Sequence, residues 1–457
     1  ILQSSLFWFC LALTTVVAFR DLHIDYPGPY CAQRGSCCNN RQDNCSVPIS
    51  STLCYCDEFC DRTRGADCCP DFLKFCRHEP DPVYRCLHNG RYYNFRESFK
   101  DNCNTCKCGM RGEVSCERDV CLQDQAIIDN VNSISNALGW TARNYSEFWG
   151  RKFQEGLKLR LGTLEPSYKV KAMTRISNEA KELPRYFNAN DYFSGLISEV
   201  RDQGWCGSSW VMSTTSVASD RFAIMSKGKE VIQLAPQQIL SCARRQRGCN
   251  GGHLDAAWRF LHKQGVVNED CFPYKAIVTQ CKFRRMHSLS GAGCRPPYKV
   301  KRDHFYTVGP VYPLDKEMDI MIEIMDNGPV QATLRVYRDF FSYGGGIYRH
   351  SSASRSEEYG FHSVRLVGWG EERVGYQTEK YWIAANSWGN WWGENGYFKI
   401  LRGSNECMIE DYVLASLPHV YEHRWNPFGF LCEPKYFCSA FQFVSFLHWV
   451  LDSEVRH

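Results

Sequence analysis

The most diagnostic segment of this chain reads Gln203-Gly204-Trp205-Cys206-Gly207-Ser208-Ser209-Trp210. The residues that follow carry apolar or small side chains at helical spacing: Val211, Thr215, Ala218, Phe222 and Met225. This spacing predicts a helix that begins at Ser209, so the positive end of the helix dipole lies beside the Ser209 side chain. A cysteine in that place would be easily ionised, whereas a serine hydroxyl has no comparable anionic state.

Three other segments supply partners for such a site. Residues 361–370, Phe-His-Ser-Val-Arg-Leu-Val-Gly-Trp-Gly, predict a strand that His362 enters at its start. Residues 386–389, Asn-Ser-Trp-Gly, supply the amide of Asn386, which can orient an imidazole. Residues 249–252, Cys-Asn-Gly-Gly, offer bare backbone that an extended peptide can approach.

With these motifs, residues 183–418 resemble the papain-like C1 peptidases, and cathepsin B in particular. Further motifs fall in that family's order, namely Gly328-Pro329-Val330, Gly346-Ile347-Tyr348 and the glycine-bounded run 393–403. The resemblance implies an α+β fold, a papain-like two-lobed domain with a helical lobe and a β-barrel-like lobe. Small disulfide-rich modules precede it.

The resemblance also assigns roles to four residues. Gln203 is the oxyanion-hole side chain, Ser209 stands at the nucleophile position, His362 is the general base and Asn386 its orienter. Because serine replaces the family's cysteine, we predict a pseudoenzyme in which these four positions are vestigial. The alternative is a secreted hydrolase or peptidase that uses Ser209 with His362.

Two other details of the resemblance bear on activity. In the family the cysteine at position 206 pairs with the one at position 249, which argues against Cys206 as a substitute nucleophile. Cathepsin B also carries a cysteine-bounded loop with two adjacent histidines that capture a substrate carboxylate. The matching stretch, from Cys271 to Pro297, contains only His287, which is interpreted as a solvated residue in a basic loop.

Cysteines dominate the first third of the chain. Of 26 cysteines in 457 residues, 16 lie between Cys31 and Cys121, which indicates disulfides formed in an oxidising compartment. Residues 20–79 contain the doublets Cys37-Cys38 and Cys68-Cys69 and resemble a somatomedin-B module. Residues 84–122 contain Cys103-Asn104-Thr105-Cys106-Lys107-Cys108 and resemble a von Willebrand factor C module. Zinc is the alternative for such cysteines, but their density without clustered histidines favours disulfides.

The remaining segments of the chain carry fewer motifs. Residues 1–19 contain an apolar run and predict an N-terminally trimmed signal peptide, with a buried helix or a short anchor as alternatives. Residues 123–182 resemble the cathepsin B propeptide, and we expect them to stay attached and to pack over or beside the cleft. The tail, residues 419–457, is not assigned. Asn44 and Asn144 stand in glycosylation sequons.

Charge favours neither nucleic acid nor a generally acidic substrate, because the formal net charge is only +4. Local basic clusters are more informative: Arg244, Arg245 and Arg247 precede Cys249, and Lys282, Arg284, Arg285, Lys299, Lys301 and Arg302 flank Cys294. They predict an electropositive patch for sulfated glycans or acidic matrix proteins, with a merely solvated face as the alternative. No motif calls for a cofactor, a metal or a transmembrane segment.

The order of these parts resembles the tubulointerstitial nephritis antigen family. That resemblance implies a secreted basement-membrane glycoprotein that acts in cell adhesion and matrix assembly, with laminin, type IV collagen and integrins as partners. A peptidase fold can persist as a binding scaffold after its chemistry is lost. A weaker third possibility is that the cleft binds peptides without cutting them.

Overall fold

The structure is a computed structural model. It describes residues 29–49, 52–60, 67–78, 85–110, 112–166, 173, 177, 179, 181–283, 286–295, 300–314, 316–352 and 358–421. The predicted signal peptide and residues 422–457 of the tail lie outside these ranges, as do Arg284, Arg285 and Lys299. Among the described residues, each helix is too short or too polar to cross a bilayer.

The chain divides into two compact units. The first comprises Ile1–Lys158, Tyr337–Gly344 and His350–Tyr359, and the second comprises Leu159–Val336, Gly345–Arg349 and Gly360–His457.

The first unit begins with a small module whose core consists largely of cystine. Its elements are α2 (Cys31–Arg34), β1 (Ser46–Ile49), β2 (Thr52–Tyr55) and α4 (Phe72–Cys76), with β1 and β2 antiparallel. Five disulfides join the described cysteines: Cys31–Cys56, Cys37–Cys76, Cys38–Cys45, Cys54–Cys69 and Cys60–Cys68. So few residues bury little apolar area, and the crosslinks supply the missing stability.

A second module follows in the same unit. The hairpin β3 (Arg85–His88) and β4 (Arg91–Asn94) is followed by the sheet β5 (Ser98–Asp101), β6 (Asn104–Cys108) and β7 (Val114–Cys116). Its disulfides are Cys86–Cys108, Cys103–Cys121 and Cys106–Cys116. The last described elements before residue 160 are α5 (Gln125–Ser133), α6 (Ser135–Leu138), β8 (Trp140–Ala142) and α7 (Phe153–Leu159).

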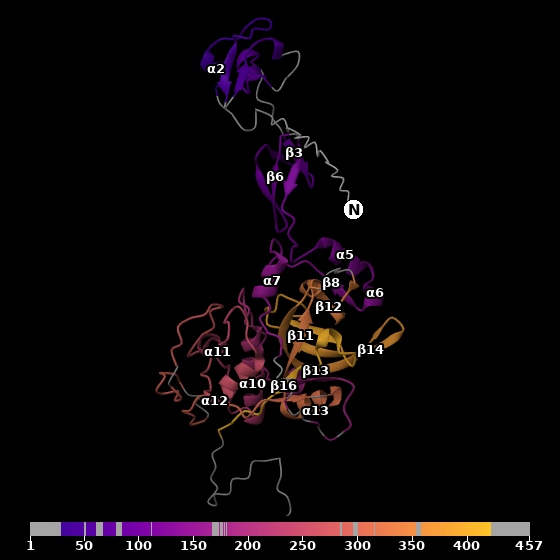
Figure 1. The fold of residues 1–457 in the computed structure, drawn as a ribbon. Coiled ribbons are helices and arrows are strands. Elements are labelled where there is room, and N and C mark those ends of the chain that lie inside the picture. Colours follow the sequence, from indigo (N-terminus) through magenta and orange to yellow (C-terminus); the bar gives the residue numbers. More distant parts are fainter. Residues whose placement is uncertain are drawn as a thin grey trace, which may run out of the picture. The chain divides into compact units, whose positions relative to one another are not determined.

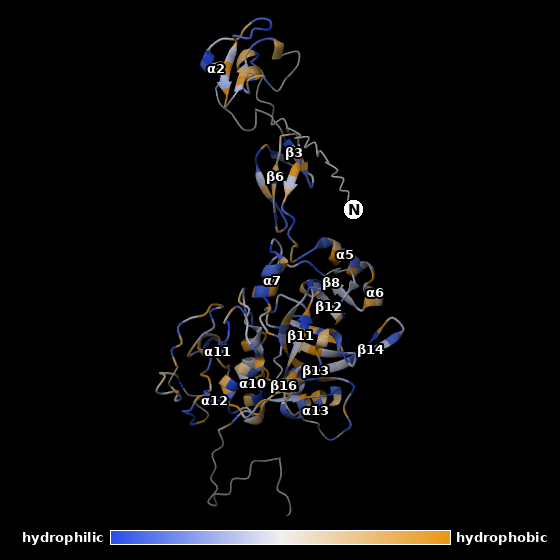
Figure 2. Ribbon diagram, viewed as in Figure 1, coloured by the Kyte–Doolittle hydropathy of each residue, from blue (hydrophilic) through white to orange (hydrophobic). Residues whose placement is uncertain are grey.

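The second unit contains a large, mainly antiparallel sheet. Its strands run in the order β10 (Tyr312–Leu314), β16 (Val413–Ala415), β11 (Val330–Val336), β13 (Gly360–Val374), β14 (Gln377–Ala385), β15 (Tyr397–Leu401) and β12 (Tyr343–Tyr348), with β9 (Phe187–Asn188) also paired to β13. Strand β11 is almost entirely buried, and so is the middle of β13, residues 362–370. Figure 2 shows hydrophobic colours on strands of this sheet.

Helices form the other part of the second unit. The central one is α10 (Ser209–Met225), which is accompanied by α11 (Pro236–Cys242) and α12 (Leu254–Lys263), while α9 (Ala189–Tyr192) and α13 (Glu317–Asn327) lie elsewhere in the unit. The 3-10 turn Glu406–Met408 also belongs to this unit, and the 3-10 turn Arg338–Ser342 belongs to the first. Figure 1 shows α11 and α12 on one side of α10 and the sheet strands on the other. Because α10 is buried on nearly every side, it needs no polar face.

Three disulfides and several buried ion pairs hold the second unit together. Cys206–Cys249, Cys242–Cys281 and Cys271–Cys294 are the crosslinks among its described cysteines. Arg302 was assigned to the exposed basic cluster, and that assignment is wrong. Its guanidinium is buried and paired with Glu230 at 2.5 Å, because a cation taken out of water requires a counter-charge.

Candidate functional site

The predicted helix after the diagnostic segment is confirmed. Ser209 is the first residue of α10, Ser208 precedes it as the N-cap, and the Ser209 side chain is fully buried. Cys206 is bonded to Cys249, so its sulfur carries no thiol that might replace the serine. Gln203 is also fully buried, and its side-chain amide lies 2.9 Å from the Cys206 carbonyl oxygen.

His362 and Asn386 come from neighbouring strands of the sheet. His362 is the third residue of β13, and Asn386 follows the last residue of β14, the strand paired with β13. His362 Nε2 lies 2.7 Å from Asn386 Oδ1. Since a carbonyl oxygen only accepts, Nε2 carries the proton and Nδ1 is left with its lone pair.

Burial lowers the pKa of His362 to about 4, and the hydrogen bond to Asn386 opposes that shift only in part. The imidazole is therefore neutral at pH 7. Its Nδ1 atom is buried and has no hydrogen-bond partner among the described residues. A catalytic base in working order would have a hydrogen bond from the nucleophile at this atom.

The space in front of Ser209 is filled by the chain itself. Residues 160–164, here called the plug, cross the cleft in the second unit. The Leu161 carbonyl oxygen accepts a hydrogen bond from the Ser209 backbone N–H at 3.3 Å and another from Gln203 Nε2 at 3.1 Å. These two donors are the ones that an oxyanion hole would present to a reaction intermediate, so a peptide carbonyl of this chain occupies that position.

Backbone pairing holds the plug on its other side. Gly252 N–H donates to the Gly162 carbonyl at 3.0 Å, and Leu164 N–H donates to the Gly252 carbonyl at 3.0 Å. Gly162 has φ +113°, and a Cβ atom added to it would lie 2.1 Å from the Gly207 carbonyl carbon. Only glycine therefore permits this approach of two backbones.

Arg160 anchors the start of the plug. Its side chain is almost fully buried, and Nη1 lies 2.8 Å from Asp202 Oδ1. The guanidinium carbon lies 4.7 Å from the ring centre of Trp205 and 5.5 Å from that of Trp391. An ion pair and two cation–π contacts together compensate the loss of hydration of this cation.

A chain of buried hydroxyl groups fixes the direction of the Ser209 proton. Ser213 Oγ lies 2.7 Å from the Ser209 carbonyl oxygen and must donate to it, because each hydroxyl has one proton and a carbonyl has none. Ser363 Oγ, 2.9 Å from Ser213 Oγ, therefore donates to Ser213. Thr163 Oγ1, 2.8 Å away, then donates to Ser363. Ser209 Oγ, 2.9 Å from Thr163 Oγ1, is left to donate to Thr163.

The far end of this hydroxyl chain is anchored in the core. Gln331 Nε2 donates to Ser213 Oγ at 2.7 Å and to Thr214 Oγ1 at 2.8 Å, while Gln331 Oε1 accepts from Trp258 Nε1 at 2.6 Å. Two acceptor lone pairs on Ser213 are thereby used, and its proton is committed to the Ser209 carbonyl. The hydroxyl proton of Ser209 is thus donated to Thr163 in the plug, and His362 Nδ1 receives no hydrogen bond from a described residue.

Two clusters of cysteine and histidine bring possible metal-ligand atoms within 4.8 Å of one another: Cys31, Cys56 and Cys69 in one, and His88, Cys106 and Cys116 in the other. Every one of these cysteines is in a disulfide. A disulfide sulfur is not a thiolate and does not bind zinc in the manner of a structural site. The cysteines are therefore explained by crosslinking, and the ring of His88 lies 2.9 Å from the Asp101 carboxylate.

The structure brings Gln203, Ser209, His362 and Asn386 into one buried site, as the motifs predict. His287 is exposed and lies outside this site, in a separate pocket described below. The Asn44 and Asn144 side chains are exposed, so both sequons are accessible to a glycosyltransferase.

Sequence reasoning missed Arg160, Thr163, Ser213 and Ser363. A Thr in the propeptide-like segment and a Ser after His362 are common residues. The role of Thr163 and Ser363 in the site depends on the contact between them, and these two positions are 200 residues apart in the chain.

The comparisons with known proteins agree with this fold. The model of the papain family cysteine proteases matches residues 183–417. A protein of Rattus norvegicus, tubulointerstitial nephritis antigen-like, is 44% identical over 86% of this chain and 89% of its own length. Tubulointerstitial nephritis antigen of Homo sapiens is 42% identical, with 86% and 87% covered. Among solved structures, procathepsin B S9 of Trypanosoma congolense is 28% identical with a TM-score of 0.55, covering 65% of this chain and 99% of its own.

Proposed function

The chain belongs to the papain family of cysteine proteases and, within it, to the tubulointerstitial nephritis antigen family, and on that premise we propose a secreted extracellular-matrix glycoprotein that does not catalyse. It acts in cell adhesion and matrix assembly, and its cathepsin B-like unit serves as a binding scaffold. The observation that carries this proposal is the direction of the Ser209 hydroxyl, which donates to Thr163 in the plug.

Loss of catalysis follows from three features of the site. A serine at the helix start has no thiolate form, so it depends on a base to remove its proton. The base, His362, is neutral and is oriented by an amide, which cannot stabilise an imidazolium as a carboxylate does. The oxyanion position is taken by the Leu161 carbonyl. Each feature opposes a different step of acyl transfer.

Retention of the propeptide-like segment is part of the same proposal. With no peptidase to release, nothing requires the plug to leave, and its contacts favour its staying. The plug contributes the buried side chain of Arg160, two backbone hydrogen bonds to Gly252 and the Thr163 hydroxyl, which is hydrogen-bonded to the Ser209 hydroxyl. The cleft is then an internal packing interface, which argues against the idea that it binds foreign peptides.

The matrix role rests on the relatives and on the disulfides. Laminin, type IV collagen and integrins are the proposed partners, and the basement membrane is the proposed location. Eight disulfides join described cysteines of the first unit, a density typical of proteins that mature outside the cytosol. Carbohydrate at Asn44 and Asn144 would mark exposed faces of that unit.

A direct test uses the full secreted chain and a serine-directed fluorophosphonate. We expect no covalent label on Ser209 and no peptidase activity that His362→Ala removes. Binding to surfaces coated with laminin or type IV collagen should be unchanged in Ser209→Ala. Labelling of Ser209 that disappears in His362→Ala would establish the rival hydrolase, and a large loss of matrix binding in Ser209→Ala would refute a scaffold independent of that site.

A further inference from the structure

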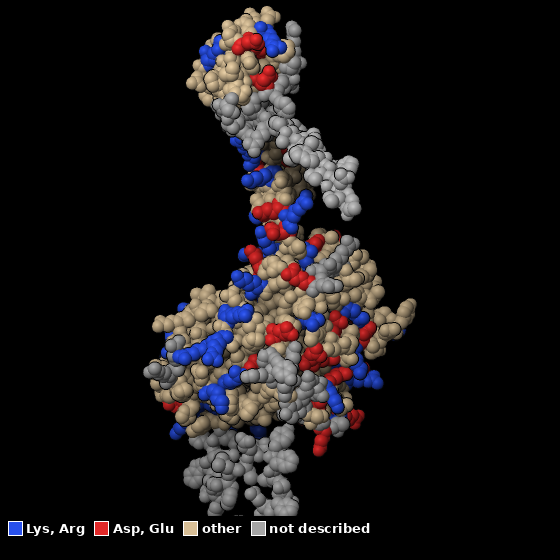
Figure 3. Space-filling view, in the orientation of Figure 1, with Lys and Arg blue, Asp and Glu red and all other residues tan. Residues whose placement is uncertain are grey.

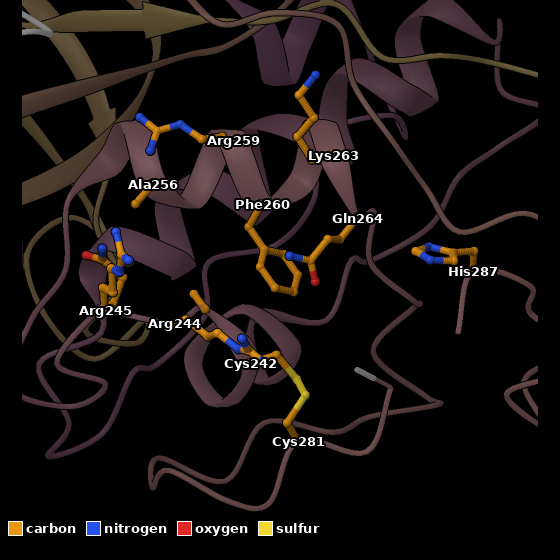
Figure 4. Close-up of a pocket in the computed structure, with 12 residues that line it drawn as sticks. Cys242, Arg244, Arg245, Ala256, Arg259, Phe260, Lys263, Gln264, Cys281 and His287 are labelled. Carbon is orange, nitrogen blue, oxygen red and sulfur yellow. A yellow bond between two sulfur atoms is a disulfide. The ribbon is translucent and has the colours of Figure 1, made fainter. Parts of the chain in front are cut away.

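A second concave site lies in the helical part of the second unit and shares no residue with the plug. It is a pocket of about 450 Å³ between α12 and the loop that follows α11 (Figure 4). The residues that line it are Cys242, Ala243, Arg244, Arg245, Gln246, Ala256, Arg259, Phe260, Lys263, Gln264, Cys281 and His287. Its volume falls in the range of small-ligand sites.

The charged side chains that line this pocket are all basic. Arg244, Arg245, Arg259 and Lys263 contribute four cations, His287 is a fifth possible one, and no Asp or Glu takes part in the lining. All five side chains are exposed. Figure 3 shows Lys and Arg gathered on the face that carries α11 and α12.

Counter-charges for these cations are scarce. Arg259 pairs with Asp255 one turn earlier on α12, at 2.6 Å, but its guanidinium stays two-thirds exposed and keeps further N–H groups for other partners. Arg244, Arg245 and Lys263 make no ion pair with any residue in the described ranges. By contrast, Arg160, Arg221 and Arg302 of the same unit each have an acidic partner.

The walls of the pocket are rigid. Arg259 and Lys263 lie four residues apart on α12, and Phe260 reaches from the same helix toward the Cys242–Cys281 disulfide (Figure 4). That disulfide fixes the end of α11, from which Arg244 and Arg245 follow directly. Arg244 and Arg245 from the loop after α11 and Arg259 and Lys263 from α12 belong to one lining, and an anion bound there would reduce the repulsion among these like charges.

We propose that this pocket binds a sulfated oligosaccharide. Guanidinium groups present paired N–H donors that match the oxygen geometry of an oxyanion, and a sulfate ester stays ionised throughout the physiological pH range. The Phe260 ring, buried at the base of the lining, gives the pocket an apolar wall, and the exposed cations supply the recognition. A pocket of this size accepts one or two sugar units, whereas an acidic peptide in extended form would need a longer groove.

The test measures binding of the full secreted chain to an immobilised heparin-type oligosaccharide and to the same sugar after chemical desulfation. The test variant carries Arg244→Ser, Arg245→Ser and Lys263→Ser. The matched control carries Arg185→Ser, Lys229→Ser and Arg373→Ser, exposed residues of the same unit outside the pocket, so that both variants lose three positive charges.

We expect the sulfated sugar to bind more tightly than the desulfated one, and the affinity to fall as salt is raised. The test variant should bind at least about tenfold more weakly, because the loss of even one charged hydrogen bond has an effect of that size, while the control changes little. If both variants lost the same affinity for the sulfated sugar, the effect would come from net charge alone, and the pocket would not be the binding site. Equal binding of the desulfated sugar, or binding of an acidic peptide but of neither sugar, would overturn the ligand class. Secretion yield and thermal unfolding of both variants verify that the fold is kept.

Discussion

The plugged cleft and the basic pocket lie in one unit, but they differ in whether their polar groups have partners within the chain. In the cleft, the hydroxyl of Ser209, the oxyanion donors and Arg160 all bind partners from the same chain. In the pocket, Arg244, Arg245 and Lys263 are exposed and have no ion-pair partner among the described residues. The first arrangement stabilises the fold, and the second leaves binding capacity for something outside the chain.

This contrast indicates that, in a peptidase fold without its nucleophile, the exposed pocket and not the former catalytic cleft is available for binding. A buried polar group must be satisfied whether or not it catalyses, because leaving it unpaired costs about 1 to 3 kcal/mol. The hydroxyl chain from Ser209 to Gln331 meets that requirement. Exposed cations carry no such requirement, so their clustering is free to serve recognition.

The largest effect should come from Gly162→Ala. The new Cβ would lie 2.1 Å from Gly207 backbone and would require φ +113°, so the plug must leave the cleft. We expect a loss of about 3 kcal/mol or more in unfolding free energy, the scale of strain and overpacking combined, together with rapid proteolysis at residues 159–166.

Gly195→Ala is the control for this change. Gly195 has φ +75° and open space around it, so its variant reports backbone strain without the clash. If Gly162→Ala is no worse than Gly195→Ala in thermal unfolding, and the plug stays resistant to protease, then the plug does not hold the cleft as tightly as described.

The second effect depends on pH and comes from His362. Its pKa in the folded chain is about 4, below the ordinary value of 6.5, so between these values the unfolded chain binds a proton that the folded chain rejects. Stability from this residue is complete above pH 6.5 and is lost as the pH falls toward 4. At pH 5 the loss is roughly 2 kcal/mol.

His362→Gln should remove that part of the pH dependence while keeping a donor for Asn386. The measurement is urea unfolding of the natural chain and of the variant at pH 7.5 and pH 5, followed by tryptophan fluorescence. An equal drop in stability for both proteins between these two pH values would mean that the imidazole is not buried in neutral form.

A smaller effect is expected from Thr163→Val, which keeps the shape of the side chain and deletes the hydroxyl between Ser209 and Ser363. The buried Ser209 hydroxyl then lacks its acceptor, and we expect a loss of about 1 to 2 kcal/mol in chemical unfolding. Thr215→Val is the control, because the Thr215 hydroxyl bonds only to carbonyl groups of its own helix. A loss at Thr163 no greater than the loss at Thr215 would contradict the proposed hydroxyl chain.

The smallest effect on stability should come from the basic pocket. The triple variant Arg244→Ser, Arg245→Ser, Lys263→Ser removes exposed charges without buried partners, so its unfolding free energy should stay within about 0.5 kcal/mol of the natural value. Differential scanning calorimetry checks this. A loss of several kcal/mol in unfolding free energy would show that these cations stabilise the fold. The pocket would then not differ from the cleft in this respect.

Much of the site was predictable because local patterns carry it. Helical spacing after Ser209 and strand character around His362 follow from short-range preferences, and both are found in α10 and β13. Arg302 shows the limit of this reasoning. By composition it belongs to an exposed basic stretch, yet it pairs in the interior with Glu230, 72 residues away in sequence.

The sequence by itself determined the papain-like α+β fold, the disulfide-rich first third and the serine at the start of α10. Each can be recognised from short motifs of consecutive residues. The tertiary structure alone decided that Cys242 pairs with Cys281 and Cys271 with Cys294, where several pairings were open. It also decided the direction of the Ser209 proton and the meeting of α12 with the Arg244 loop. These depend on distances between residues remote in the chain, which no local preference fixes and only packing of the whole unit sets.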